Sequence, residues 1–244
     1  MPLRLGFDLD GVLADMNTAL VREARRLFPD AELHSTSVPT SPAPNPEGVD
    51  AGDPADVPST PLALTPRQER QLWDAVKRIE NFWETLHETE PGIVARLADI
   101  ARARRWEVMF MTSRPRTAGD IVQVQSQRWL SRLGFEYPSL FVVTGSRGRI
   151  AASLDLDVVV DDRPENCLDV ALDSKARAIL IWRSAEGGVP ASARRLGIGG
   201  VPTVSACLEL LVEADDPAAG PASLVDRLRR LLRLKSPSTE QARA

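Results

Sequence analysis

The chain has 244 residues, a formal net charge of −4, and 43% hydrophobic residues. This length and composition fit a globular protein with one large domain or a core with an inserted subdomain, and the negative balance gives no global field for a nucleic-acid polymer. No apolar run reaches the roughly 18 residues that a membrane span needs, and no apolar leader precedes the first expected strand. The two cysteines, Cys167 and Cys207, form no spaced framework, so we expect a reduced, cytoplasmic setting.

Residues 3–9 alternate between apolar and polar side chains, which is the period of a strand. Asp8 and Asp10 stand at its end, before Gly11, and their i, i+2 spacing puts both carboxylates on the same side. In an open α/β sheet this carboxyl edge is where ligands bind. Two acids so close repel each other unless a divalent cation or a shared proton offsets their charge. A plain turn is the alternative, since Asp and Gly favour turns.

The segment after the first expected strand differs in composition from the rest of the chain. Residues 16–28 have the apolar stripe of a helix, whereas residues 35–64 are rich in proline and show no period, which predicts a flexible loop. Thr65 to Gln68 then combine a cap residue, a proline at the first helical position and a capping box, so a helix is expected to about Glu80. Residues 16–89 are therefore predicted to form a small helical subdomain inserted after the first strand.

The remainder alternates between helical and strand patterns. Helices are predicted after Pro91-Gly92, over 121–133, briefly over 149–154, and from Cys207; strands are predicted over 107–111, 140–143, 157–160, 178–182 and 201–204. Nearly all-apolar strands separated by helices indicate a Rossmann-like α/β fold, a parallel sheet with helices on both faces. Residues 1–15 and 90–213 would form this core.

The tail, residues 214–244, contains an amphipathic basic helix over 224–235. Such a helix can dock on the core, pair with another subunit in a homo-oligomer, or contact an anionic surface. Docking is the interpretation that requires the least from the rest of the sequence.

Polar side chains gather at the ends of three predicted strands. Each group alone fits a strand-to-helix turn, but their occurrence on successive strand ends indicates one shared crevice. The groups are Asp8 and Asp10, then Thr112, Ser113 and Arg114, then Asp161 and Asp162.

Phosphoryl transfer is the chemistry that such a set suits. Asp8 and Asp161 offer the hard oxygen ligands that Mg²⁺ prefers. Asp8 can attack phosphorus to form an aspartyl-phosphate, and Asp10 can protonate the leaving oxygen and then deprotonate water. The hydroxyl and guanidinium groups of the second strand end can bind phosphoryl oxygens, and Arg147 is placed to add a further cation.

Three segments carry a family resemblance: FDLDGVLAD, FMTSRP and VVVDDRPEN resemble the first, second and fourth motifs of the haloacid dehalogenase (HAD) superfamily of phosphatases. The resemblance covers about residues 3–15 and 90–185, and that family carries a helical cap where this chain has its insertion. It implies that Asp8 is the nucleophile, Asp10 the acid/base and Thr112 the phosphate-binding hydroxyl.

The same resemblance implies a Mg²⁺ site formed by Asp8, the backbone carbonyl of Asp10 and Asp161, with Asp162 assisting. The third motif of the family normally has a lysine. Arg147, fourteen residues before the first acid of the Asp-Asp pair, stands at that position, and Arg149 is a second candidate. Arginine also binds phosphate, but its shape and reach differ from those of lysine.

Within the superfamily, the DGVLAD and DDRPEN segments and the passage from Phe82 to Gly92 are similar to those of 5′(3′)-deoxyribonucleotidase-like phosphatases. Members of that group act on nucleoside monophosphates, whose bases contact aromatic residues of the cap. Phe82 and Trp83 would take this role, and ordinary packing between insertion and core is their alternative.

These observations favour a Mg²⁺-dependent phosphomonoesterase, 5′-nucleotidase-like, acting on a small phosphorylated substrate. A dehalogenase is disfavoured because that branch typically lacks the second acid, Asp10. The alternatives are a phosphatase or phosphomutase for another phosphorylated metabolite, and a non-catalytic phosphate- or partner-binding module, because fold alone does not settle function.

Overall fold

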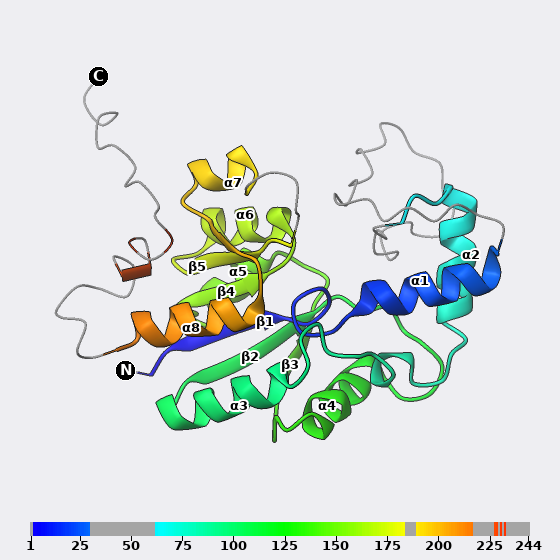
Figure 1. The fold of residues 1–244 in the computed structure, drawn as a ribbon, viewed down its shortest axis with the longest axis horizontal. Helices are drawn as coiled ribbons and strands as arrows, with labels where there is room; N and C mark the ends of the chain where they lie inside the picture. Colours follow the sequence, from blue (N-terminus) through cyan, green and yellow to red (C-terminus); the bar gives the residue numbers. More distant parts are fainter. Residues whose placement is uncertain are drawn as a thin grey trace.

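The computed structural model describes residues 2–29, 62–183 and 189–216, together with residues 227, 228, 230 and 232. Within these ranges the chain forms a six-stranded parallel sheet in the order β3–β2–β1–β4–β5–β6 (Figure 1). The strands are β1 (Arg4–Asp8), β2 (Glu107–Thr112), β3 (Ser139–Val142), β4 (Val158–Asp161), β5 (Arg177–Ile181) and β6 (Gly199–Val201). The predicted α/β class with a parallel sheet is confirmed.

The central strand is buried on both faces rather than on one. Leu5 and Phe7 are fully buried, and Gly6 lies between them on the other face of the sheet. A Cβ atom at Gly6 would approach Leu156 Cδ1 and Met111 Cε to 2.8 Å, so glycine is what allows these side chains to close over the strand. The alternating pattern at residues 4–8 therefore reflects the close packing at Gly6 as well as the polar side chains of Arg4 and Asp8.

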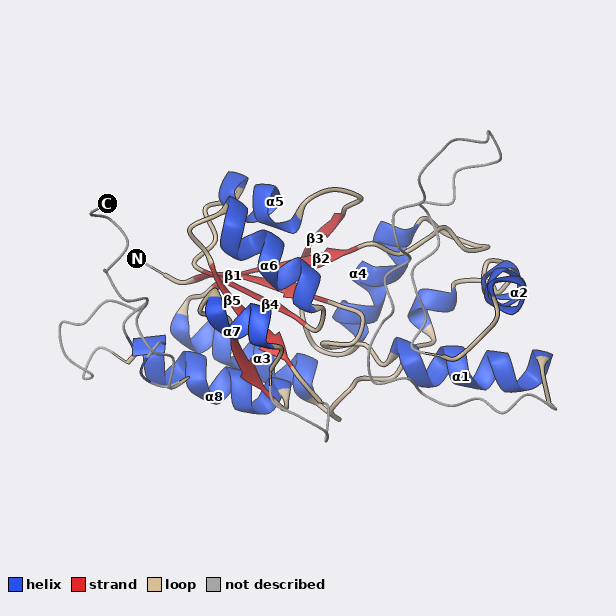
Figure 2. Ribbon diagram, turned by 90° about the horizontal axis from the view of Figure 1, so that it is seen from above, coloured by secondary structure: helices blue, strands red, loops and turns tan. Residues whose placement is uncertain are grey.

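Helices cover both faces of the sheet, as Figure 2 shows. The larger buried cluster joins β1 to α3 (Ile93–Arg104), α4 (Val122–Arg132) and α8 (Val204–Ala214). A second cluster joins the opposite face to α5 (Arg147–Ser153), α6 (Pro164–Asp173) and α7 (Ala191–Arg195). This arrangement confirms the sequence-based expectation of helices on both sides of a parallel sheet.

The segments that follow β1 lie beyond the carboxyl ends of the strands, on the right of Figure 1. They include α1 (Met16–Leu27), α2 (Pro66–Val76) and the short 3₁₀ helix η2 (Phe82–Glu84). Thr65 caps α2 in the predicted capping box with Gln68, and Asp15 caps α1. The domain boundaries at residues 15, 90 and 213 stay a prediction.

The chain leaves the sheet and returns to it along two neighbouring segments. The backbone N–H of Asp15 donates to His87 O at 2.8 Å, and that of Thr89 donates to Leu13 O at 2.9 Å. The loop that carries Asp10 is therefore hydrogen-bonded to the segment that leads into α3.

Some elements differ from the sequence-based expectations. Helices α6 and α7 were not predicted, α5 begins at Arg147 instead of 149, and α8 begins at Val204, where Thr203 caps it. Most of the predicted loop 35–64 and most of the helix expected over 224–235 lie outside the described residues. Of the described tail residues, Leu228 is buried in the core. Among the described helices, none is long and apolar enough to cross a membrane.

Candidate active site

The carboxyl ends of β1, β2 and β4 lie next to one another because β1 is the central strand of the three. The register pairs Asp8 with Met111 of β2 and Phe7 with Val160 of β4. Thr112 and Asp161, one residue further along each partner strand, therefore flank the β1 end where Asp8 stands. The structure thus brings the three predicted groups of polar side chains to one edge of the sheet.

Arg147 reaches this edge from the first turn of α5. Its Nη2 lies 2.8 Å from Asp8 Oδ1 and 3.3 Å from Ser113 Oγ, and its Nε lies 3.9 Å from Asp161 Oδ2. Its Nη1 is buried and has no hydrogen-bond partner among the described residues. Arg147 therefore contacts two of the predicted acids and retains an unused donor group.

The start of α5 is held firmly against α6. The Ser146 side chain caps α5 and donates to Asp169 Oδ2 at 2.8 Å, and the Gly148 N–H donates to the same oxygen at 2.9 Å. A Cβ at Gly148 would lie 2.3 Å from the backbone oxygen of Asp169, so only glycine permits this approach. These contacts fix the position from which Arg147 extends. Arg149, the other candidate cation, is 85% exposed and lies 4.0 Å from Asp173.

Burial raises the pKa values of the acids in this cluster, and for Asp8 and Asp162 neighbouring carboxylates add to the effect. Burial, and next the charge of Asp161, raise the pKa of Asp8 well above its usual range, although Arg147 acts in the opposite direction. Burial likewise raises the pKa of Asp161. Burial and then Asp161 raise the pKa of Asp162 to about 8. The site therefore favours a bound proton or a cation.

Two further contacts orient the acids of the β4 end. Asp161 accepts from the Arg163 N–H at 2.9 Å and from Asn166 Nδ2 at 3.0 and 3.1 Å. Asn166 was not assigned a role from the sequence, although it stands in the DDRPEN segment and in the first turn of α6. The Asp162 carboxylate packs on Gly11, where a Cβ atom would lie 1.9 Å from Oδ2 and where φ is +78°.

The polar side chains at the end of β2, which were predicted to bind a phosphate, contact other protein groups in the structure. Arg114 Nε lies 2.9 and 3.1 Å from the Asp10 oxygens, and its Nη2 lies 2.8 Å from Oδ1. Thr112 Oγ1 donates to Asp10 Oδ2 at 3.1 Å, and Ser113 Oγ donates to Val143 O at 2.9 Å. Of these groups, the Ser113 hydroxyl also lies near Arg147.

The aromatic pair expected to contact a substrate base is enclosed. Phe82 and Trp83 are fully buried and meet edge to face, with ring centroids 5.0 Å apart. Trp83 Nε1 donates to Pro115 O at 3.0 Å, and its backbone N–H donates to Gln125 Oε1 at 3.1 Å. This is the arrangement of the packing alternative, so we do not propose either ring as a substrate contact.

A divalent cation fits the donor set of this edge. Among the described residues, no three His, Cys, Asp or Glu side chains already converge as a metal site. Mg²⁺ does not require this, because it keeps several waters and is held by one or two carboxylates. The carboxylates of Asp8, Asp161 and Asp162 are hard oxygen donors whose pKa values are raised first of all by burial, and a cation bound beside them would favour their charged forms.

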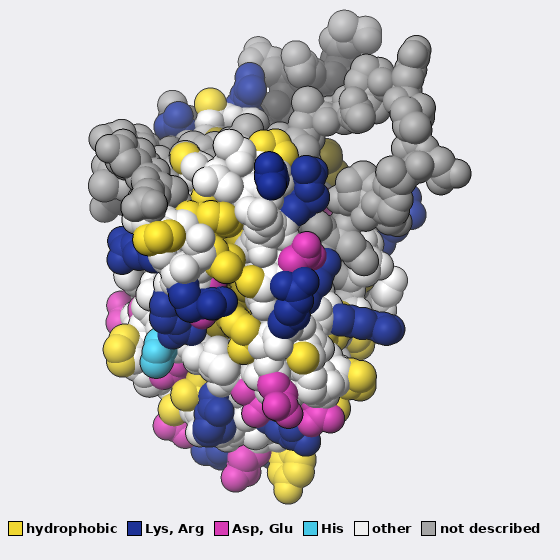
Figure 3. Space-filling view, turned by 90° about the vertical axis from the view of Figure 1, so that its right-hand side faces the viewer, with side chains coloured by type: hydrophobic (Ala, Val, Ile, Leu, Met, Phe, Trp, Pro, Cys, Tyr) yellow, Lys and Arg dark blue, Asp and Glu magenta, His cyan; other side chains and the backbone are white. Residues whose placement is uncertain are grey.

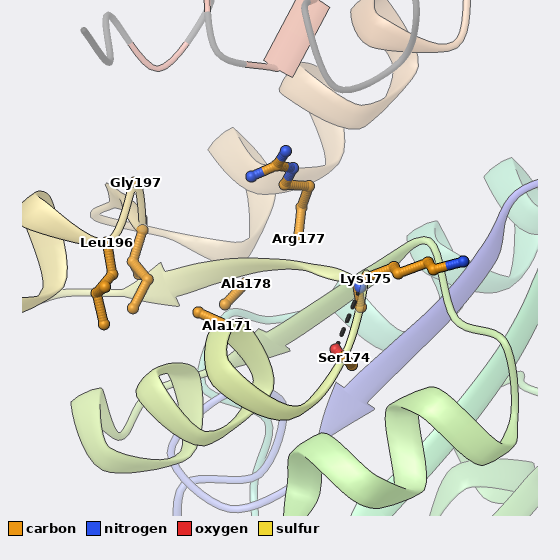
Figure 4. Close-up of a pocket in the computed structure, with 9 residues that line it drawn as sticks. Ala171, Ser174, Lys175, Arg177, Ala178, Leu196 and Gly197 are labelled. Atoms are coloured by element: carbon orange, nitrogen blue, oxygen red, sulfur yellow. Dashed lines mark hydrogen bonds between the residues drawn. The ribbon is translucent and has the colours of Figure 1, made fainter. Parts of the chain in front are cut away.

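The pocket in Figure 4 is lined by Lys175, Arg177 and residues of the loop after α7, at the amino end of β5 and thus at the opposite edge of the sheet from Asp8. On the face seen in Figure 3, basic, acidic and apolar side chains are interspersed. That face offers no uniform basic groove for a polynucleotide.

The described residues form a parallel α/β sheet with a cluster of acids at the carboxyl ends of its central strands. No protein-family model and no curated protein matches the sequence. Solved structures do match over most of the chain. A putative beta-phosphoglucomutase from Thermotoga maritima is 19% identical with a TM-score of 0.52, over 86% of this chain and 99% of that one.

A HAD family hydrolase from Deinococcus radiodurans R1, with bound phosphate and sodium, is 14% identical with a TM-score of 0.52, over 88% of this chain and 96% of that one. At these identities the likeness shows a shared fold. The chain therefore has the α/β fold of these HAD-type proteins.

Proposed function

We propose that this protein is a Mg²⁺-dependent phosphomonoesterase that works through an aspartyl-phosphate on Asp8. The observation that carries the proposal is the buried Nη1 of Arg147, which has no partner among the described residues although the same guanidinium contacts Asp8. A buried donor without an acceptor costs free energy, and more so when it is charged. A phosphoryl oxygen beside Asp8 would supply the acceptor.

Asp8, Asp161 and the backbone carbonyl of Asp10 would hold the Mg²⁺, with Asp162 assisting, and the ion would neutralise phosphoryl charge beside these acids. The Asp8 carboxylate forms a bond to phosphorus as the bond to the leaving oxygen breaks. Asp10 gives that oxygen a proton, and then takes one from the water that cleaves the aspartyl-phosphate and releases inorganic phosphate.

The chain's other residues keep this chemistry in place. Arg147 pairs with the phosphoryl oxygens, and the Ser113 hydroxyl, 3.3 Å from Arg147, is near enough to add a further donor. Asn166 and the Arg163 N–H hold the Asp161 carboxylate in orientation. Hydrolysis of phosphate monoesters needs an acceleration equivalent to about 20 kcal/mol or more, which is why several charged groups act together.

A nucleoside monophosphate is the substrate that we propose first, because the DGVLAD and DDRPEN segments are similar to those of 5′-nucleotidase-like phosphatases. The buried Phe82 and Trp83 give this choice no support, and another small phosphorylated metabolite suits the same site equally well. The substrate test must therefore include both classes.

The test is phosphate release from nucleoside and sugar monophosphates, with Mg²⁺ or EDTA, by the wild type and by Asp8→Asn. We expect metal-dependent release that Asp8→Asn abolishes. Asp99→Asn is the matched control, because Asp99 is exposed on α3 and should leave turnover unchanged. Fastest release from a sugar monophosphate would refute the nucleotide assignment alone. No release by folded wild type with Mg²⁺ would overturn the enzymatic proposal and favour a phosphate-binding module.

A further inference from the structure

Arg114 is entirely committed to protein contacts. Its side chain is 0% exposed, and its guanidinium forms a two-pronged pair with the Asp10 carboxylate, in which Nη2 lies 2.8 Å from Oδ1 and Nε lies 2.9 Å from Oδ2. The remaining terminal nitrogen, Nη1, donates to Ser126 Oγ at 2.8 Å. Each nitrogen of this guanidinium thus has a protein partner and the side chain has no exposed surface, whereas Nη1 of Arg147 has no partner among the described residues.

The orientation of the Asp10 carboxylate is fixed by hydrogen bonds, but the carboxylate is still partly accessible. It accepts the Nη2 and Nε hydrogens of Arg114 and the hydroxyl hydrogen of Thr112. A carboxylate has about four acceptor positions, so about one is left for a further partner. The side chain also keeps 15% of its surface exposed, which gives that position access to a substrate.

The guanidinium itself is held by parts of the chain that meet at this point. The Arg114 Cζ lies 4.8 Å from the centroid of the Trp83 ring, which is cation–π geometry. Trp83 belongs to η2, one of the segments that follow β1, and Ser126 belongs to α4. Ser126 and the Trp83 ring are both fully buried. The Arg114 guanidinium is therefore held by three groups: the Asp10 carboxylate, the Ser126 hydroxyl and the face of the Trp83 ring.

We propose that Arg114 is the positioning residue of Asp10. Held by Trp83 and Ser126, its guanidinium orients the Asp10 carboxylate, which exchanges protons with the leaving oxygen and with water. It is not a ligand of the phosphoryl group, which is the role that the sequence pattern favoured for it. The inference rests on the proposed function, because it concerns the acid/base of that reaction.

The orientation of an acid/base affects substrates unequally. A phenolate with electron-withdrawing groups leaves phosphorus without a proton, whereas an alkoxide needs one. Loss of the Asp10 orientation should therefore slow release of an alkoxide much more than release of such a phenolate. A general weakening of the fold, or loss of a phosphate ligand, would slow both reactions to a similar degree.

The experiment compares p-nitrophenyl phosphate with glycerol 2-phosphate, in Mg²⁺, for the wild type and Arg114→Lys. Lysine keeps the charge but cannot form the two-pronged pair. We expect kcat/KM on glycerol 2-phosphate to fall at least about tenfold further than kcat/KM on p-nitrophenyl phosphate, since misplaced catalytic groups cost up to about 10²-fold. The inhibition constant of inorganic phosphate should stay within about twofold of wild type.

Two further variants keep the test decisive. Ser126→Ala removes only the acceptor behind Arg114 and should show the same selective loss, smaller in size, even if Arg114→Lys folds poorly. Arg116→Lys, the same change at an exposed position two residues on, should behave as wild type on both substrates.

Equal losses on the two substrates, or an inhibition constant for phosphate that rises with Arg114→Lys, would overturn the positioning role. Release by the wild type from neither substrate, nor from any nucleoside or sugar monophosphate, would instead overturn the proposed function itself, and this inference with it.

Discussion

Replacing Arg147 by methionine removes a buried cation while keeping much of the side-chain volume. The guanidinium lies 2.8 Å from Asp8 Oδ1 and 3.9 Å from Asp161 Oδ2, and the three side chains are 5%, 9% and 0% exposed, respectively. Removal of one partner from a buried ion pair costs about 3–5 kcal/mol. Because the carboxylates left behind can take up protons, we expect the lower end, a loss of about 3 kcal/mol in the free energy of unfolding at neutral pH.

Urea denaturation followed by far-UV circular dichroism, in EDTA, measures this loss. The double variant Arg147→Met/Asp8→Asn should recover part of it, with a coupling energy of about 2 kcal/mol between the two sites. The exposed Arg116→Met is the control and should change stability by less than about 0.5 kcal/mol. A loss under about 1 kcal/mol, or strictly additive effects, would refute the assignment of Arg147 as the counter-charge of Asp8.

Two other predictions concern pH. Because burial and then Asp161 raise the pKa of Asp162 from 3.8 to about 8, the folded protein retains a proton that the unfolded chain releases, so this group stabilises the fold in acid and its contribution fades as pH rises between these values. The free energy of unfolding, measured by urea titration in EDTA, should fall by about 1.4 kcal/mol per pH unit over this range because of Asp162, and Asp162→Asn should remove that slope. Equal slopes in the two proteins would contradict this. Glu90 accepts the Val204 and Ser205 N–H groups at 2.5 and 2.9 Å at the start of α8, so Glu90→Gln should cost about 1 kcal/mol of stability. Burial alone would raise the Glu90 pKa, but the hydrogen bonds from Ser205 and Val204 lower it from 4.5 in the folded protein. The carboxylate's contribution to stability is therefore lost as pH falls through this lower pKa, and the difference in free energy of unfolding between wild type and Glu90→Gln should narrow in acid. A difference that stays constant with pH would contradict this.

The sheet and the strand ends could be predicted because their signals are local. Most of the strands are short apolar runs, and a polar residue directly after such a strand must stand at the carboxyl edge of a parallel sheet. This reasoning predicts from the sequence alone that Asp8, Thr112 and Asp161 lie at one edge, and the register confirms that they are neighbours. The catalytic roles assigned to them stay predictions.

The partners of these residues could not be predicted in the same way, because they depend on contacts between distant segments. Arg114 and Arg147 look alike in the sequence, yet the first is fixed by Asp10, Ser126 and Trp83 and the second keeps an unpaired nitrogen. Helix α6 was missed because its start follows an apolar strand and an Asp-Asp-Arg-Pro sequence that is also typical of a turn. The proline at its first position is the signal that could have identified it.

The central place of β1 has a consequence for how the protein is made. β1 leaves the ribosome before the other strands of the described sheet, yet it pairs with β2 and β4, and the chain must reach Asp161 before both sides of Asp8 are filled. At about 5–20 residues per second, this leaves the strand without one neighbour for about 8–30 s. During that interval Asp161 is not yet beside Asp8, so its repulsion of Asp8 begins only after β4 has been made. Pairings so distant in sequence also predict slow refolding of the full chain.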